Sequence, residues 1–78
     1  MVTPEYVRGL IAQGLQCEHL EVDGDGAHFE AVIVSLVFAG KTRVARHQLV
    51  NRALGTQMGN EIHALSMKTL TPDEWKSQ

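Results

Sequence analysis

The sequence predicts an α+β fold in which a three-stranded mixed sheet carries its helices on one face. Two long stretches repeat apolar residues at helical spacing, three short stretches alternate apolar and polar residues, and a glycine-rich turn separates the first two of these strands. The predicted order is helix, strand, strand, helix, strand, helix. A hairpin joined through a helix to a third strand is typical of a mixed sheet.

The first helix begins at a capping signal. Thr3 offers a capping hydroxyl group, Pro4 suits the first helical position, and Glu5 places an acid in the first turn. We expect the helix to end near Gln13. Its apolar stripe at helical spacing consists of Val7, Leu10, Ile11 and Leu15.

The next two elements are predicted to form a hairpin. Residues 17–22 and 28–34 alternate apolar and polar side chains, as strands do. Residues 23–26 have the sequence Asp-Gly-Asp-Gly, and these residue types tolerate the positive φ angles of tight turns. The two strands should therefore pair through this turn.

The second long helix is predicted over residues 42–58, with Gly59 as its stop signal. One face of this helix should be buried, and it contains His47, Val50, Leu54 and Met58, with Val44 beside them. A smaller apolar patch on another side contains Ala45, Leu49 and Ala53.

Residues 62–69 predict the third strand, and a short helix follows it. Thr71 and Glu74 have the spacing of a capping box, with Pro72 at the first helical position. Trp75 lies within this helix and should dock it onto the body of the domain.

Composition limits the class of protein. The 78 residues predict one small domain, residues 1–78, and no apolar run is long enough to span a bilayer. The N-terminus lacks the pattern of a secretory signal. The single cysteine, Cys17, cannot form an internal disulfide, which fits a reducing cytoplasm.

Charge is distributed unevenly, although the formal net charge of -2 argues against a general nucleic-acid binder. Acids crowd the first half of the chain, and none occurs between Glu30 and Glu61. We expect an acidic and a basic side, although two ordinary solvated faces would also fit. The basic residues in the acid-free stretch are Lys41, Arg43, Arg46 and Arg52.

His63 is the main candidate for chemistry, because no Ser-His-Asp grouping, phosphate loop or zinc-finger spacing can be assembled. It opens the third strand and shares a face with Leu65 and Met67. It either caps the edge of the core through a hydrogen-bonded nitrogen or offers an imidazole ligand at the mouth of the strand.

The remaining histidines and Asp25 have simpler interpretations. His28 should be exposed, and Asp25 is more typical of a turn residue than of a ligand. His47 is expected among apolar neighbours in the core, and His19 on a solvated strand surface. A complete metal site within this chain is therefore not expected, although one or two ligands could combine with those of a partner.

Several stretches together resemble the BolA-like family over nearly the whole chain. They include the Arg-His-x-x-Val stretch from Arg46, the His-Ala-Leu strand from His63, and the Thr-Pro-x-x-Trp ending from Thr71. The short Gly-Asp-Gly loop resembles the bacterial IbaG-type subgroup. The resemblance implies a KH-like (type II) fold and a non-enzymatic role.

The resemblance also implies a partner and a cofactor. BolA-like proteins pair with monothiol (CGFS) glutaredoxins and share a bridging [2Fe-2S] cluster, to which the glutaredoxin and glutathione supply thiolates. His63 is the implied ligand from this chain, with His28 or Asp25 as the second. This loop lacks the usual cysteine or histidine ligand, so the second ligand stays open. The isolated protein, monomeric or weakly dimeric, should hold no cluster.

Two surfaces of the second helix are candidates for binding. The partner interface is predicted at Arg46, His47, Gln48, Leu49 and Ala53, beside Ala45. The alternative is a nucleic-acid regulator, possible by analogy with KH domains although their Gly-x-x-Gly clamp is absent. Its phosphate contacts would be Lys41, Arg43, Arg46 and Arg52.

Overall fold

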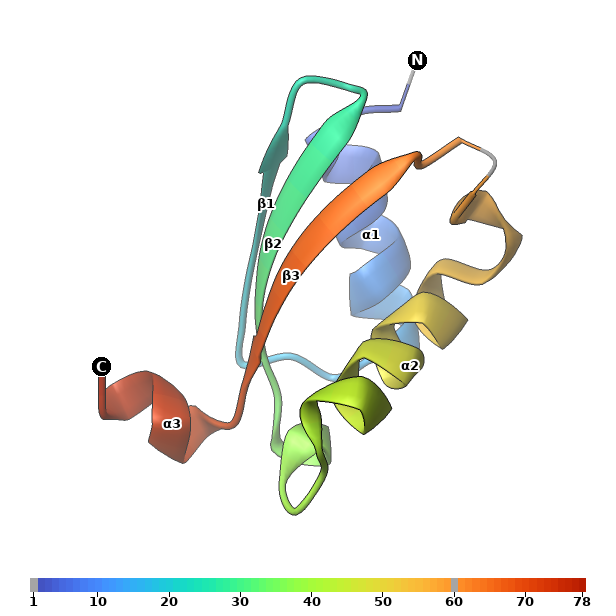
Figure 1. Ribbon diagram of the computed structural model, residues 1–78. Coiled ribbons are helices and arrows are strands. Elements are labelled where there is room, and N and C mark those ends of the chain that lie inside the picture. Colours follow the sequence, from blue (N-terminus) through green and yellow to red (C-terminus); the bar gives the residue numbers. More distant parts are fainter. Residues whose placement is uncertain (1, 60) are drawn as a thin grey trace.

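The computed structural model describes residues 2–59 and 61–78 (Figure 1). In this part of the chain, β1 (His19–Gly24), β2 (His28–Val34) and β3 (Ala64–Leu70) form one sheet in the order β1-β2-β3. The first pair is antiparallel and the second is parallel. The two longer helices, α1 (Pro4–Gly14) and α2 (Arg43–Leu54), cover one face. The predicted α+β class, element order and mixed sheet are confirmed.

The core lies between the sheet and these two helices. In β2, Phe29, Ala31 and Ile33 are buried at alternate positions, as a half-covered sheet requires. Leu65 and Met67 of β3 are half-buried and pack against the same cluster. The helices contribute Val7 and Ile11 from α1, and Val50 and Leu54 from α2. No helix in residues 2–59 or 61–78 has the length and apolar character needed to cross a membrane.

Local signals set most element boundaries. The Thr3 hydroxyl accepts a hydrogen bond from the Tyr6 N–H at 3.2 Å, so the first cap is as predicted. Strand β2 has the predicted bounds, whereas β1 begins and ends two residues later than expected, and β3 begins at Ala64 and ends one residue later. The strand pairing extends to Gly24 opposite Phe29, which leaves only residues 25–27 for the turn.

The second helix is shorter than predicted. It ends at Leu54 rather than at Met58, because Gly55 has a φ of 61°, which favours glycine and stops the helix. A 3-10 turn, η2 (Gly55–Gln57), then carries the chain toward Gly59.

The buried face of α2 also differs from the prediction. Val50 and Leu54 are buried, but Val44 is 66% exposed and His47 is only half-buried. Ala53 instead faces α1 so closely that a Cβ placed on Gly14 would lie 2.5 Å from the Ala53 Cβ. The helix packs against α1 as well as the sheet, which turns its inner face toward Ala53.

The last helix, α3 (Pro72–Lys76), lies on the opposite side of the sheet from α1 and α2 (Figure 1). The prediction that the helices share one face therefore holds for α1 and α2 and not for α3. Its predicted capping box is present, with Thr71 and Glu74 bonded in both directions. Trp75 stacks on His19 of β1 with ring centroids 4.7 Å apart. The docking role of Trp75 is confirmed, and the expectation of a merely solvated His19 was wrong, since its ring also contacts Glu21 at 2.8 Å.

Candidate functional site

His63 lies immediately before β3, and its side chain is exposed. No hydrogen bond or ion pair reaches its imidazole from the residues that the structure describes. The core-edge interpretation is therefore wrong, because that role needs a sheltered and hydrogen-bonded ring. Leu65 and Met67 do pack against the core as expected, but the row of packed residues ends before His63.

The sheet register places His63 next to the β1–β2 turn. His28 is the partner of Ala64 in the parallel pair, so His63 lies one position beyond this pair, level with Ala27. Figure 1 shows the turn and the start of β3 at the same end of the sheet. This end thus gathers the three residues that were predicted as cluster ligands, His63, His28 and Asp25.

Asp25 organises the turn. Its Oδ1 accepts hydrogen bonds from the backbone N–H groups of His28 at 2.9 Å and Ala27 at 3.0 Å. These two donors, His28 first, lower the pKa of the Asp25 carboxyl group, because they stabilise its charged form. The turn-forming interpretation of Asp25 is confirmed, and the carboxylate has one oxygen that these bonds leave unused.

His28 is exposed, as predicted, on the face of the sheet opposite Phe29. It lines a shallow hollow of about 400 Å³ together with Asp25, Ala64 and Ser66. His63 lies outside β3, between the buried Ile62 and Ala64, the partner of His28 in the sheet. The structure brings the two histidines to the same end of the sheet.

The donors at this end fit a shared metal centre better than a closed one. Across residues 2–59 and 61–78, no group of three or more His, Cys, Asp or Glu side chains lies close enough to hold a metal ion. An exposed imidazole without a partner, such as that of His63, can donate a nitrogen to a metal held mainly by another protein. Cys17 does not add to this end, since it precedes the start of β1, which pairs with Val34 at the other end of the sheet. Burial also raises the pKa of its thiol.

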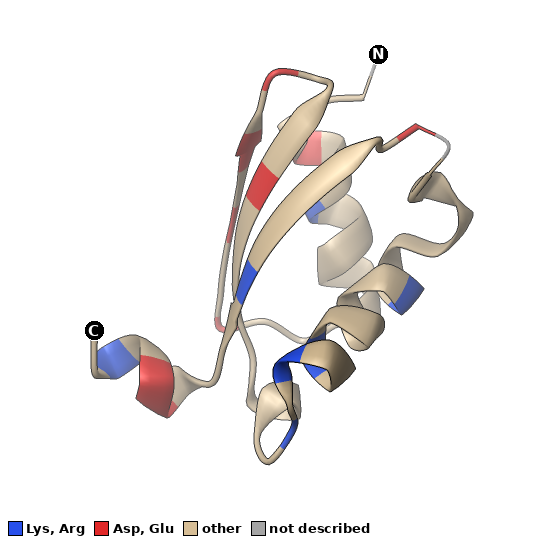
Figure 2. Ribbon diagram, in the orientation of Figure 1, with Lys and Arg blue, Asp and Glu red and all other residues tan. Residues whose placement is uncertain are grey.

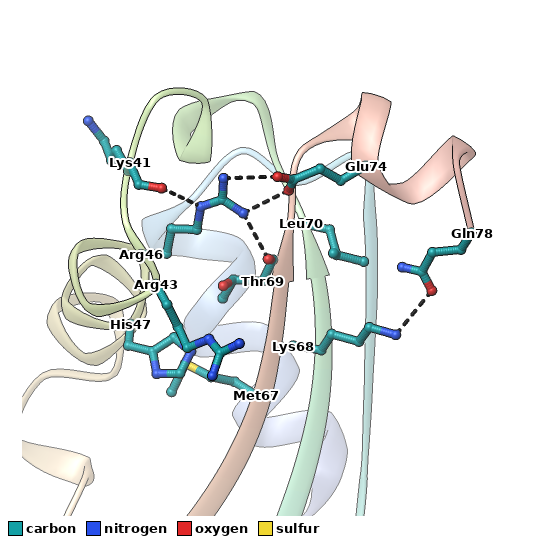
Figure 3. A pocket seen from close by; sticks show the side chains of 10 residues that line it. All are labelled: Lys41, Arg43, Arg46, His47, Met67, Lys68, Thr69, Leu70, Glu74 and Gln78. Carbon is teal, nitrogen blue, oxygen red and sulfur yellow. Dashed lines mark hydrogen bonds and ion pairs between the residues drawn. The ribbon is translucent and has the colours of Figure 1, made fainter.

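Arg46, at the other end of the sheet, is bound within the fold (Figure 3). Its side chain is 13% exposed and donates to the backbone oxygens of Lys41 and Thr69, both at 3.0 Å. Its two Nη atoms bond the two carboxylate oxygens of Glu74 at 2.7 and 3.3 Å. The guanidinium group therefore joins the loop before α2 to β3 and α3 through four of its five N–H donors.

The Arg46–Glu74 pair has a clear electrostatic signature. The hydrogen bonds from Arg46, and then the Thr71 N–H, lower the pKa of Glu74 from 4.5 to about 2. Sequence reasoning identified Glu74 only as half of a capping box. Its second partner lies 28 residues away, and no local pattern in the sequence indicates such a contact.

The other residues predicted for binding lie on different parts of α2. Gln48 is exposed, whereas Leu49 and Ala53 are half-buried against the core. His47 is half-buried and faces a hollow beside Met67. Of the predicted partner surface, Gln48 and Leu49 line one open hollow of about 390 Å³ with Ala45, whereas His47 and Ala53 lie outside it.

The predicted separation of charge is present (Figure 2). Basic residues lie at the start of α2 and in the loop before it, and acidic residues lie in β1, β2 and the turn between them, as well as in α3. The cations in the acid-free stretch that remain exposed are Lys41, Arg43 and Arg52.

Comparisons with known proteins agree with this architecture. The chain is 37% identical to BolA-like protein 2 of Mus musculus over 99% of this chain and 94% of that protein. It is 36% identical to acid stress protein IbaG of Escherichia coli over 88% of this chain and 83% of that protein. It is 47% identical to the DNA-binding transcriptional regulator BolA of Vibrio cholerae, over 68% of this chain and 50% of that protein.

A solved structure of a bolA protein homologue from Coxiella burnetii superimposes with a TM-score of 0.88. It shares 47% sequence identity and covers 97% of this chain and 99% of its own. The family description "BolA-like protein" matches residues 11–74, which include all three strands, α2 and the exposed His63. The chain therefore belongs to the BolA-like family.

Proposed function

We propose that this chain is a non-enzymatic partner of a monothiol glutaredoxin and that His63 ligates a [2Fe-2S] cluster shared by the two proteins. The observation that carries the proposal is the exposed imidazole of His63, immediately before β3 in a BolA-like chain. This imidazole has no hydrogen-bond partner among the described residues. The glutaredoxin and glutathione would supply thiolate ligands.

The surroundings of His63 support this role. β3 is paired with β2 along its whole length, so the backbone that follows His63 is held in place by the sheet. The ring is exposed, so a partner can approach it without unfolding the sheet. When bound, a cluster with imidazole on one iron supplies a redox centre of higher potential than one with thiolates alone.

The second ligand from this chain is proposed to be His28 or Asp25. Both are exposed at the same end of the sheet as His63. His28 has a free imidazole among the described residues, whereas Asp25 already uses one oxygen in the turn. We expect the complex to operate in the reducing cytoplasm, where the thiolates of the partner and of glutathione stay available.

Reconstitution with a monothiol glutaredoxin, glutathione, iron and sulfide tests the proposal. Visible absorption and circular dichroism should report a cluster, and His63→Ala should change the spectrum or prevent its formation. His28→Ala, at the same sheet end, tests whether this residue supplies the second ligand. A mixed complex whose spectrum is unaltered by His63→Ala would rule out ligation by this residue.

A second candidate function is binding to nucleic acid. The relative from Vibrio cholerae is named a DNA-binding transcriptional regulator, and Lys41, Arg43 and Arg52 are exposed cations near α2. Arg46 is less suited to contact phosphates, because four of its five N–H donors are already bonded within the fold. If these cations contact phosphates, the slope of log affinity against log salt should fall by about one for each cation removed.

A further inference from the structure

One side of β3 is an open sheet edge. β3 is the last strand in the order β1-β2-β3 and pairs only with β2. The Leu70 carbonyl accepts from the Ser35 N–H on the β2 side, whereas the Thr69 carbonyl accepts from Arg46 on the other side. Since backbone groups of alternate residues point to the same side of a strand, Met67 and Thr69 direct theirs away from β2. Arg46 occupies the Thr69 carbonyl, so the groups left at the open edge among the described residues are the Met67 N–H and C=O and the Thr69 N–H.

The open edge is accessible at Met67. A hollow of about 560 Å³ lies over this stretch, between the start of α2 and the end of β3 (Figure 3). Arg43 and His47 line it from α2, and Lys68 and Gln78 line it from the other side of the strand. Among the described residues, no loop or side chain bonds to the Met67 backbone. Such an edge is a ready template for another strand.

The charges around this edge select the kind of segment that fits. Arg43 is exposed on one side of β3, and Lys68 is exposed on the other. Arg46 adds little positive charge to the hollow because Glu74 neutralises it. An added strand points neighbouring side chains to opposite faces, so two adjacent acidic residues would meet Arg43 and Lys68 separately.

We infer that the open edge of β3 binds an extended acidic segment of a partner protein by strand addition at Met67, with the Thr69 N–H as a further donor. Main-chain hydrogen bonds would hold the segment, and the flanking cations would select for acidic residues. A nucleic acid fits less well, because the edge presents carbonyl oxygens as well as N–H groups. A phosphodiester backbone has no donors to satisfy those carbonyls.

The edge site is distinct from the His63 site. His63 precedes the first residue of β3, whereas Thr69 is next to its last residue. The inference therefore does not depend on cluster ligation, and the two can fail separately. His63→Ala should bind the acidic segment with unchanged affinity, and Arg43→Glu should leave the spectrum of a reconstituted cluster unchanged.

The probe is a fluorescein-labelled synthetic peptide in which two adjacent glutamates are flanked by valine and threonine. NMR should show the amide protons of Met67 and Thr69 moving downfield and exchanging more slowly when it binds. A peptide N-methylated at the pairing positions should bind about tenfold more weakly, because it lacks the donors. Equal affinity for both peptides, or unmoved Met67 and Thr69 amides, would overturn the inference.

Charge and backbone variants separate strand addition from general attraction. The double variant Arg43→Glu, Lys68→Glu should lower the affinity for the acidic peptide about threefold or more for each exposed charge that is reversed. It should raise the affinity for a peptide with lysines in place of the glutamates. Met67→Pro removes the edge N–H at a position where an edge strand tolerates proline, and should also weaken binding. Displacement of the peptide by a single-stranded oligonucleotide that moves the same amides would overturn the inference in favour of a nucleic-acid groove.

Discussion

The two ends of the sheet use their polar side chains in opposite ways. At the end with the β1–β2 turn, His63 and His28 are exposed, and neither imidazole forms a hydrogen bond within the described residues. At the other end, Arg46 bonds two backbone carbonyls and one carboxylate. Fully bonded side chains hold a fold together, whereas exposed donors without partners are available to another molecule. Mutations at the two ends should therefore separate stability from binding.

Removal of Arg46 should have the largest effect on stability. Arg46→Ala leaves the Thr69 and Lys41 carbonyls without their donor and Glu74 without its charge partner. We expect the free energy of unfolding to fall by about 2–3 kcal/mol, since several bonds to a largely buried charged group are lost. Urea denaturation followed by far-UV circular dichroism measures this change.

Arg46→Lys is the control for that variant. Lysine keeps the positive charge but cannot form the bidentate contact with Glu74. Arg46→Lys should therefore retain only part of the stability that Arg46→Ala loses. Full recovery would show that charge alone matters and that the hydrogen-bond geometry at this end has no special role.

The contact between α1 and α2 should give the next largest effect. A methyl group on Gly14 would collide with Ala53, so Gly14→Ala must push the two helices apart. We expect a loss of about 1–3 kcal/mol, as is usual for overpacked interiors. The matched variant Gly14→Ala with Ala53→Gly restores the space and should recover part of the loss. An unchanged Gly14→Ala midpoint in urea would contradict the close approach.

Some of these features follow from the sequence and others do not. The Thr3 and Thr71 caps and the strand at residues 28–34 depend on residues close together in the chain, so local patterns predicted them. Glycine residues at positions 55 and 59 can each end a helix, and their identity alone does not distinguish them. The backbone conformation of Gly55 shows that the helix ends there.

The site was predicted less completely, for the same physical reason. The family pattern identified His63, but its exposure depends on where the packed row of β3 ends. The Arg46–Glu74 pair joins residues that are distant in the chain. A helical wheel shows which residues share a face, but it cannot show that α2 packs against α1 through Ala53. Contacts of this kind are products of tertiary structure and leave no periodic signal.

Acid should weaken the Arg46 end in a defined pH range. The pKa of Glu74 is about 2 in the folded protein, below the 4.5 of an unperturbed carboxyl group. Its stabilising contribution is therefore complete above pH 4.5 and is lost as the pH falls toward 2. Fluorescence of Trp75, the single tryptophan and a neighbour of Glu74 in α3, should report this loss. Glu74→Gln should remove this part of the pH dependence, and an identical titration of both proteins would contradict the assignment.

Replacement of His63 should have the smallest effect on stability, and that result would sharpen the contrast most. Its side chain is exposed and forms no bond within the described residues, so His63→Ala should change the free energy of unfolding by less than about 0.5 kcal/mol. The same variant is expected to abolish or alter the shared cluster. Loss of ligation without loss of stability is the behaviour of a residue whose partner belongs to another protein. A large loss of stability on His63→Ala would instead mean that the ring supports the sheet end, and the spectral change could no longer be assigned to ligation.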